Sequence, residues 1–479
     1  MTSGGMILGA VLVTLCVAAV ALISGRNVRS TRDFTIAGSR AGWQIVAGII
    51  VGALVGGSST VGTAQAAFVY GLPAWWFTLG AGLGCLVLAG FFARPLRLSN
   101  VETLPQFLVT SFGTPMRPLI AICDSIGIFM TIPGQVAAAL ALLAVLLPWP
   151  DIAIIGVAGL LIVLYVFTGG AISAGTAGFV KLLIAFTALI VFGAVALALG
   201  GGVSGFEAAL PGRYFDLFGN GLSKDLGSGI GIILGVLTTQ VYVQAVLAGR
   251  DVRQSRLGAV IAGIGTTLFG LGGVAVGMFM KVHEPTIRPA EALPLFAAHY
   301  VPGILGGMLI GAILITVITC AGGLALGIAT MVTRDLYQQL LRPGMRDGEG
   351  VAVARTVIVA VVILGLFVGA SNAMKLIINY SFLAFAFRAD VILVPLIVAV
   401  FFGRSRLCGT GAGIGAVLGG MLANIGWSLA VGRGEAVFAG LVGSAAGLAI
   451  GYGLEQRLGA RPAPVSAVLS GEASRSRSR

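Results

Sequence analysis

Long apolar runs alternate with short polar loops along almost the whole chain. A helix needs about 20 apolar residues to cross a bilayer, and a lipid-embedded backbone must satisfy its own hydrogen bonds. This pattern predicts an all-α polytopic membrane protein with about thirteen transmembrane helices. The runs lie near 6–24, 43–70, 73–93, 117–147, 151–168, 174–200, 228–248, 257–281, 303–332, 352–371, 376–402, 409–431 and 435–454.

The second run carries a polar interruption at its centre, the sequence Gly56-Gly57-Ser58-Ser59-Thr60. Adjacent glycines weaken a helix, and hydroxyl side chains compete for its backbone hydrogen bonds. In secondary transporters, a helix interrupted at mid-membrane uses its freed backbone groups to bind ions or solutes. A small-residue face for helix packing is the alternative interpretation. We predict an unwound segment near Gly56 to Ser59 that contacts a solute.

Composition supports a membrane protein and excludes several classes. The chain has 479 residues, of which 57% are hydrophobic and only 10% charged, and its mean hydropathy is +1.04. The net charge of +12 comes largely from arginines in short loops, so we expect no nucleic-acid partner. The five cysteines lack metal-ligand spacing, and no catalytic constellation is apparent. We therefore expect neither an enzyme nor a resident cofactor, apart from a coupling ion such as sodium or a proton.

Arginines concentrate in one set of loops, at 25–40, 249–256, 334–350 and 403–408. By the positive-inside rule these loops are predicted to be cytoplasmic, which places the N-terminus outside and the C-terminus inside. We expect a bacterial-type plasma (inner) membrane as the location. Residues 1–458 are predicted to form one transmembrane domain, and 459–479 a disordered cytoplasmic tail.

Six short stretches in order resemble the sodium/solute symporter family over roughly residues 5–455. They are DFTIAGSRAGW (33–43), YGL (70–72), TLPQFL (103–108), YVFTGGAISAGTAGFVK (165–181), QAVLAGRDVRQSRLG (244–258) and TVITCAGGLALGIATMVTRDLY (316–337). Each stretch is a weak signal alone, but their order together with the predicted spans makes the resemblance specific.

The resemblance implies a LeuT-type fold with two inverted five-helix repeats, the first helix of each being broken. The repeats would cover about 43–200 and 228–402, with peripheral helices at 6–24 and 409–454. The sequence supports the second break only softly, through three glycines and Thr238-Thr239-Gln240. The implied function is secondary active transport of a small organic solute by alternating access. The candidate solute-binding residues are Gly56, Gly57, Ser58, Ser59, Thr78, Phe129, Gln135, Thr239 and Gln240.

By the same resemblance, one sodium ion would lie between the second and ninth spans. Its backbone ligands would be the carbonyls of Gly52, Val55 and Thr316, and its side-chain ligands would come from Thr319 and Cys320. Cys320 departs from the family's usual hydroxyl, and a neutral thiol is a poor ligand for hard sodium.

The sixth span departs further, because Ala177 and Gly178 stand where the family has Thr-Asp, and Lys181 follows one turn later. Two interpretations of Lys181 are open. It could extend to the membrane surface, or its ammonium could occupy the cation space and bind the carbonyls of Gly52 and Val55 and the hydroxyl of Thr319. The second interpretation predicts a protein that does not need sodium, with proton coupling, uniport and exchange all open.

Three further charges lie inside predicted spans: Asp124, Arg388 and Asp390. Charges at membrane depth are costly and usually functional. Asp124 and Asp390 are candidate proton carriers, while a structural ion pair between spans is the expected role of Arg388.

The sequence is also compatible with other functions. The first alternative is a conventional sodium-coupled symporter in which Lys181 reaches the surface. The second is a membrane sensor that keeps the fold, which the short tail disfavours. A channel is disfavoured because no pore-loop filter sequence appears. The sequence identifies neither the solute nor the oligomeric state.

Overall fold

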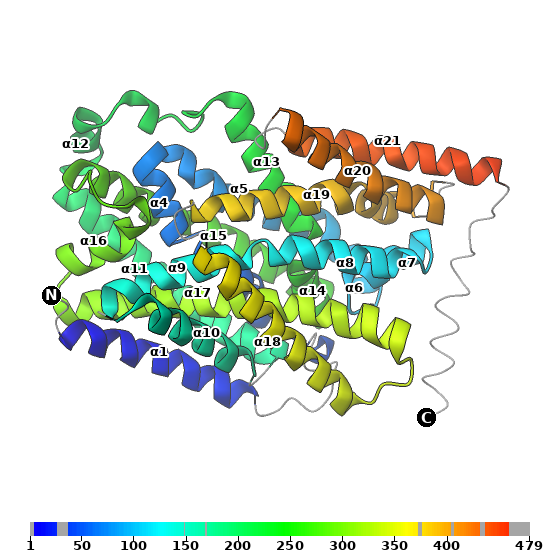
Figure 1. The fold of residues 1–479 in the computed structure, drawn as a ribbon, viewed down its shortest axis with the longest axis horizontal. Coiled ribbons are helices and arrows are strands. Elements are labelled where there is room, and N and C mark those ends of the chain that lie inside the picture. Colours follow the sequence, from blue (N-terminus) through cyan, green and yellow to red (C-terminus); the bar gives the residue numbers. More distant parts are fainter. Residues whose placement is uncertain are drawn as a thin grey trace.

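The computed structural model describes residues 4–25, 37–147, 149–167, 170–371, 376–403, 407–431 and 436–458. In these ranges the chain is helical, with one isolated bridge between Ala41 and Gly249. Most of the helices run along the long axis of the molecule (Figure 1). The predicted all-α class is confirmed. The proposed disordered tail and five of the loop arginines, Arg26, Arg29, Arg32, Arg404 and Arg406, lie outside the described residues.

The helices follow the predicted apolar runs in order. In the first half they are α1 (Gly4–Gly25), α3 (Trp43–Leu54), α4 (Val61–Tyr70), α5 (Trp76–Val87), α6 (Ala93–Leu98), α7 (Leu104–Phe112), α8 (Met116–Phe129), α9 (Ile132–Leu146), α10 (Asp151–Phe167) and α11 (Gly170–Leu199). In the second half they are α12 (Gly202–Ala209), α13 (Leu222–Thr238), α14 (Gln240–Ala248), α15 (Val252–His283), α16 (Ala292–Tyr300), α17 (Gly303–Met331), α18 (Asp347–Ser371), α19 (Ile377–Phe401), α20 (Thr410–Ala430) and α21 (Ala436–Arg457).

The number of membrane spans is smaller by a strict criterion than the sequence predicts. Nine helices in the described ranges are long and apolar enough to cross a membrane, or ten if the bent pair α13 and α14 is one span. Three shorter apolar helices lie in Gly4–Cys16, Trp43–Leu54 and Asp151–Leu164. The count of about thirteen therefore stays a prediction, partly because the break in the second run leaves two helices too short to count separately.

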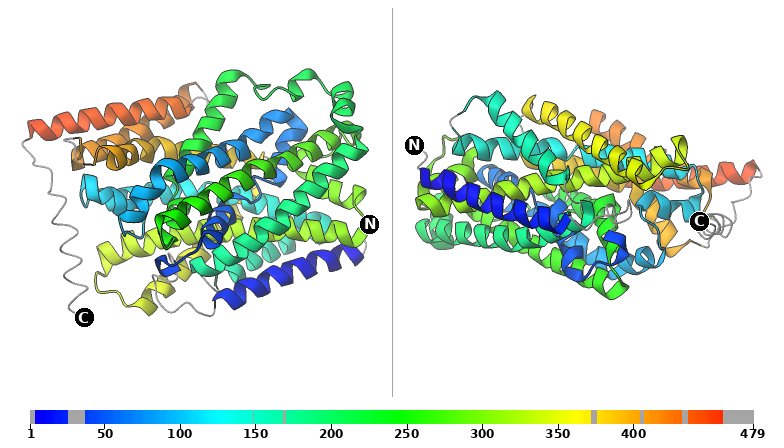
Figure 2. Two further views of the ribbon diagram at one scale, coloured as in Figure 1. Left: turned by 180° about the vertical axis from the view of Figure 1, so that it is seen from behind. Right: turned by 90° about the horizontal axis from the view of Figure 1, so that it is seen from below.

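Glycines allow neighbouring helices to approach closely. Along α20 and α21, Cβ atoms on Gly415 and Gly447 would each overlap the backbone carbonyl of the other residue. The two helices lie side by side at one edge of the molecule (Figures 1 and 2). Small residues at helix contacts are typical of membrane bundles, where close backbone packing replaces the hydrophobic effect.

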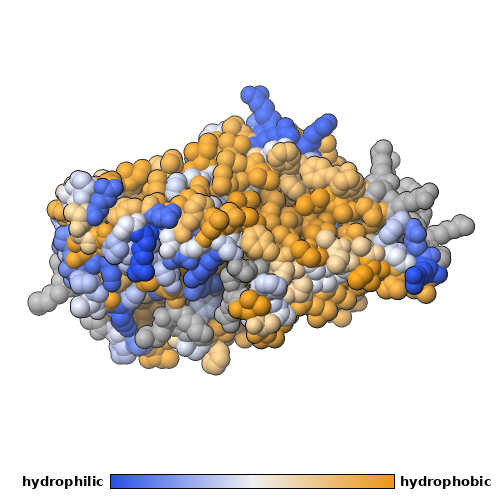
Figure 3. Space-filling view, turned by 90° about the horizontal axis from the view of Figure 1, so that it is seen from above, coloured by the Kyte–Doolittle hydropathy of each residue, from blue (hydrophilic) through white to orange (hydrophobic). Residues whose placement is uncertain are grey.

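The helix α17 forms the centre of the bundle, and its most apolar stretch is 83% buried. It contacts α1, α3, α8, α9, α11 and α18. Large apolar side chains on outer helices face outward instead, such as Phe367, Leu429 and Val442, each at least 70% exposed. Figure 3 shows a broad apolar area, with hydrophilic residues gathered mainly toward the ends of that view. Such a surface suits a multi-pass membrane protein.

Candidate functional site

The first break lies where the glycine and serine run predicts it. Helix α3 ends at Leu54 and α4 begins at Val61, leaving the segment 55–60 non-helical and buried. Hydroxyl groups satisfy part of its backbone: Ser59 Oγ accepts from the Gly56 N–H at 2.8 Å, and Thr60 Oγ1 donates to the Gly56 carbonyl at 2.8 Å. The predicted unwinding is confirmed.

Two other helices contact this break through polar side chains. On α9, Gln135 Oε1 accepts a hydrogen bond from the Gly57 N–H at 2.6 Å. On α19, the hydroxyl of Ser381 lies 2.7 Å from that of Ser58. A Cβ atom on Gly56 would collide with both Gln135 and Cys320, so glycine is required there. The freed backbone thus binds side chains from α9 and α19 in this conformation.

A glycine contact brings α11 against α3. Cβ atoms on Gly48 and Gly178 would each overlap backbone atoms of the opposite helix, Gly48 meeting Gly175 and Gly178 meeting Gly48. The two helices therefore touch backbone to backbone, and we call Gly48, Gly175 and Gly178 the glycine seam. One turn beyond it on each helix, Gly52 and Lys181 come opposite one another.

The ammonium of Lys181 is held between two backbone carbonyls. Its Nζ donates to the Gly52 carbonyl at 2.9 Å and to the Thr316 carbonyl at 3.0 Å. The side chain is only 1% exposed, so it does not extend to the surface. Lysine has three N–H donors, and a buried ammonium requires such acceptors. Two of the three carbonyls that the family resemblance implies as sodium ligands thus face an ammonium nitrogen.

The remaining candidate cation ligands lie around the same point. Thr319 Oγ1 donates to the Thr316 carbonyl at 3.0 Å, and Cys320 Sγ donates to the Ala53 carbonyl at 2.9 Å. Val55 adopts an extended conformation at the end of α3. In the hydrogen bonds of the described residues, neither the Val55 carbonyl nor the Thr319 hydroxyl is an acceptor for Lys181. The expected acceptor set is therefore partly different.

The second break is a single residue. Helix α13 ends at Thr238, α14 begins at Gln240, and the two meet at 46° around Thr239. Asp124 on α8 accepts a hydrogen bond from the Gln240 N–H at 2.9 Å through Oδ2. A carboxylate at the N-terminus of α14 is favoured because the helix dipole is positive there. The second break, for which the sequence provides only a weak signal, is therefore present.

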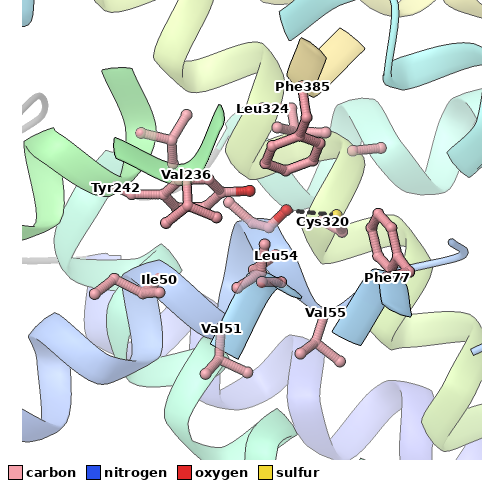
Figure 4. Close-up of a cluster of buried hydrophobic side chains, with 14 of the residues drawn as sticks. Ile50, Val51, Leu54, Val55, Phe77, Val236, Tyr242, Cys320, Leu324 and Phe385 are labelled. Carbon is pink, nitrogen blue, oxygen red and sulfur yellow. Dashed lines mark hydrogen bonds between the residues drawn. The ribbon is translucent and has the colours of Figure 1, made fainter. Parts of the chain in front are cut away.

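Side chains converge between the two breaks (Figure 4). Leu54 and Val55 come from the end of α3, and Tyr242 from the first turn of α14. Phe385 of α19 stacks on Tyr242 with ring centroids 6.3 Å apart. Phe77 of α5 meets Phe385 edge to face at 6.2 Å. The region between the breaks is therefore filled mainly by aromatic and aliphatic groups.

Three of the candidate solute-binding residues make their contacts away from the first break or lie at the end of a helix. Thr78 is buried against α15, where a Cβ atom on Gly270 would overlap its hydroxyl. Phe129 is the last residue of α8 and is partly buried. The side chain of Gln240 binds the backbone N–H of Leu104 on α7 at 2.7 Å, which ties α14 to that helix. The structure thus brings Gln135 to the first break more directly than these residues.

The buried charges of α19 face opposite sides. Asp390 accepts a hydrogen bond from Asn424 of α20, and Gly440 of α21 packs against its carboxylate. Arg388 packs instead against Gly127 of α8. No carboxylate oxygen of a described residue lies within 4.0 Å of its guanidinium, and its three nitrogens have no hydrogen-bond partner there. The ion pair expected for Arg388 is therefore not formed in this conformation.

Comparison with known families agrees with this geometry. Residues 34–419 match the family model described as the sodium:solute symporter family. The chain belongs to that family. The match covers both breaks, the glycine seam and every candidate residue of the site.

Relatives in this symporter family are named for different solutes. The chain is 24% identical over 374 residues to the High-affinity choline transporter 1 of Drosophila melanogaster, which covers 74% of this chain and 60% of that protein. It is also 24% identical over 414 residues to the High-affinity proline transporter PutP of Bacillus subtilis, covering 81% and 85% of the two chains. The chain thus spans less than two thirds of the choline transporter's length.

A solved structure shows the same fold. A Na⁺-coupled sialic acid symporter in its substrate-bound outward-open state superimposes with a TM-score of 0.79 at 14% sequence identity, covering 96% of this chain and 99% of that one. The LeuT-type class predicted from the sequence is confirmed by this likeness.

Several residues of the site were not predicted from the sequence. Ser381, Tyr242 and Phe385 lie in the region between the breaks. Gly48 and Gly175 allow the close approach of α3 and α11 that places Lys181 opposite Gly52. A sequence signal existed for one helix: Ser381, Phe385 and Arg388 are spaced four and three residues apart, so they share one helix face. That spacing also separates them from Asp390.

Proposed function

We propose that this chain is a secondary active transporter that moves a small organic solute across the plasma membrane by alternating access. The family and its fold support this activity. The two inverted repeats would comprise about 43–200 and 228–402, with peripheral helices at 6–24 and 409–454. The arginine-rich loops would be cytoplasmic, with the N-terminus outside and the C-terminus inside.

The solute would bind between the two breaks. Gly56 to Ser59 would provide backbone groups, while Gln135, Phe129, Thr239 and Gln240 would form the walls, with Thr78 further away. The contact between Gln135 and the Gly57 N–H supports this placement, because a solute could replace that hydrogen bond. Asp124 and Asp390 remain proposed proton carriers.

We propose further that Lys181 occupies the position of the coupling cation, so that transport does not require sodium. The observation that carries this proposal is the placement of Lys181 Nζ at 2.9 and 3.0 Å from the carbonyls of Gly52 and Thr316. A sodium ion and an ammonium about 4 Å apart would repel each other by ~4 kcal/mol at an effective dielectric of 20, roughly a thousandfold in affinity.

A conventional sodium-coupled symporter is the second candidate. The description of the family and the Na⁺-coupled structural neighbour favour it. In that case Lys181 would leave the two carbonyls during part of the cycle, and sodium would bind there with Thr319.

Transport measurements on purified protein test the proposal. A thermal-shift screen against amino acids, sugars, carboxylates and vitamins, in sodium and in potassium, would first identify the solute. Uptake into proteoliposomes then compares the two salts for the wild type and for Lys181→Gln. Potassium is preferable to choline as the replacement cation, because relatives include choline transporters.

We expect wild-type uptake to be equal in the two salts. Lys181→Gln frees the Gly52 carbonyl, so we expect sodium to stabilise this variant by about 2–3 kcal/mol when present near 100 times its Kd. A second thermal-shift series in rising sodium measures that effect. Wild-type uptake that collapses without sodium, together with normal behaviour of Lys181→Gln, would contradict the proposal and support the conventional symporter.

A further inference from the structure

The guanidinium of Arg388 is buried without a hydrogen-bond partner among the described residues. The residue is 1% exposed, and none of its three nitrogens makes a hydrogen bond. The ring of Phe385 packs against it, with its centroid 4.5 Å from the guanidinium carbon. A buried charge that lacks hydrogen bonds is costly, and more so at membrane depth. An anion that accepts hydrogen bonds from the guanidinium would offset this cost.

The guanidinium lies on the face of α19 that meets both breaks. Ser381 touches Ser58 of the first break at 2.7 Å, Phe385 stacks on Tyr242 beside the second, and Arg388 follows on the same face. From Ser381 to Arg388 the helix rises about 10 Å. Arg388 therefore borders the space in which the solute is proposed to bind.

Asp124, an acid that interacts electrostatically with Arg388, uses one of its two oxygens for a hydrogen bond to another group. Asp124 lies three residues before Gly127, the residue against which Arg388 packs, so both residues face α19. Its Oδ2 is bound to the Gln240 N–H, while its Oδ1 has no hydrogen-bond partner in the described part of the chain. Asp124 is within electrostatic range of the guanidinium but forms no ion pair with it.

We infer that Arg388 binds the carboxylate of the transported solute. This inference rests on the proposed transport function and names the class of its solute: a small molecule with one carboxylate and an apolar remainder. Arginine presents paired N–H donors that match a carboxylate. The apolar remainder would lie against Tyr242, Phe385 and Leu324, which border the same space (Figure 4). The side chains are in contact in this conformation, so the solute enters when the helices separate.

Matched pairs of ligands test the inference. The full-length purified protein is measured by thermal shift with butyrate against butyramide, benzoate against benzamide, and proline against prolinamide. We expect stabilisation by one or more of the acids and not by the corresponding amide. The proline pair shows whether an ammonium is also accepted, as the free oxygen of Asp124 would allow.

Variants locate the effect. Arg388→Gln should weaken acid binding about 100-fold, the loss expected for two charge-assisted hydrogen bonds. Arg388→Lys keeps the charge but not the paired N–H donors of the guanidinium, so it should weaken acid binding about 10-fold. Arg117→Gln is the matched control: Arg117 is an arginine of α8 bound to Asp335 at 2.7 Å, and its loss should leave the preference for acids intact.

A structural role would give other results. If Arg388 serves mainly as a partner of Asp124, Asp124→Asn/Arg388→Gln should restore the stability lost in Arg388→Gln and still bind acids, which would overturn the inference. The double variant also serves if Arg388→Gln does not fold, because it removes both charges together. Acid binding that is lost in the double variant supports the inference.

Two failures can be told apart. Wild-type protein that is stabilised by no acid of the panel, or equally by the amides, overturns the carboxylate inference. Acid binding without accumulation of the labelled acid in proteoliposomes leaves Arg388 as a carboxylate site and contradicts the proposed transport function.

Discussion

Both breaks leave backbone groups without helical hydrogen bonds, and side chains of opposite charge bind these groups at the two breaks. At the first break, hydroxyls, the amide of Gln135 and the ammonium of Lys181 satisfy the freed backbone. At the second break, the carboxylate of Asp124 binds the freed N–H of Gln240. The carbonyl end of a broken helix attracts cations and its N–H end attracts anions. Each break thus holds a fixed charge of the sign that its helix end prefers.

One span provides a partner for each break. Gln135 on α9 binds Gly57, and Asp124 on α8 binds Gln240. Between them the span is itself interrupted at Met130 and Thr131. The difference between the breaks therefore lies in their partners: a neutral amide and a lysine at the first, and an acid near an unpaired arginine at the second.

The largest expected effect tests whether the glycine seam sets up the first break. Gly178→Ala would place a Cβ atom on the Gly48 carbonyl, and overpacking of this kind costs about 3 kcal/mol. Thermal unfolding in detergent measures the loss. Gly156→Ala in α10 is the control, because its Cβ would meet no atom within 4 Å. Equal stability of the two variants would show that the seam is not tightly packed.

A smaller effect compares the breaks directly. Gln135→Ala removes the acceptor bound to the buried N–H of Gly57, which costs about 2 kcal/mol. Thr239→Ala should cost about 1 kcal/mol or less, because the Gly235 carbonyl accepts from both Thr238 and Thr239 and keeps the former. Denaturation of both variants under one condition gives the ranking. The reverse order would mean that the hydrogen bonds at the second break are harder to replace than those at the first.

The smallest effect separates the roles of Cys320 and Lys181. Cys320→Ser keeps a donor for the Ala53 carbonyl, so stability should change by less than about 0.5 kcal/mol. Sodium should still not stabilise this variant, because Lys181 remains in place. Thermal shifts in sodium and potassium measure this. A sodium-dependent increase in the Tm of Cys320→Ser would show that the thiol, rather than the lysine, keeps sodium out.

Local chemistry made the first break predictable and the second difficult. Gly56 and Gly57 weaken the helix by themselves, and the hydroxyls that follow satisfy the opened backbone. The second break occupies one residue, Thr239, and its stabilising partner Asp124 lies on a different span. Nothing in the sequence around Thr239 indicates that partner.

The position of Lys181 along its span was predictable from the sequence, but its hydrogen-bond acceptors were only partly predictable. Its position along the span follows from the family pattern. Its acceptors depend on the backbone approach of α3 and α11, which is set by glycines that look like ordinary packing residues in the sequence. The lack of a partner for Arg388 depends on how α8 and α19 are rotated, and one-dimensional spacing does not contain that information.

The glycine seam also limits which single substitutions the site can tolerate. Any side chain at position 178 would bring a Cβ atom into the Gly48 carbonyl. Loss of Lys181 alone would leave the Gly52 carbonyl without its donor. We therefore expect each of these substitutions to lower stability when it is made alone. Because both positions act on the backbone of α3, we expect tolerated changes to occur at the two positions together.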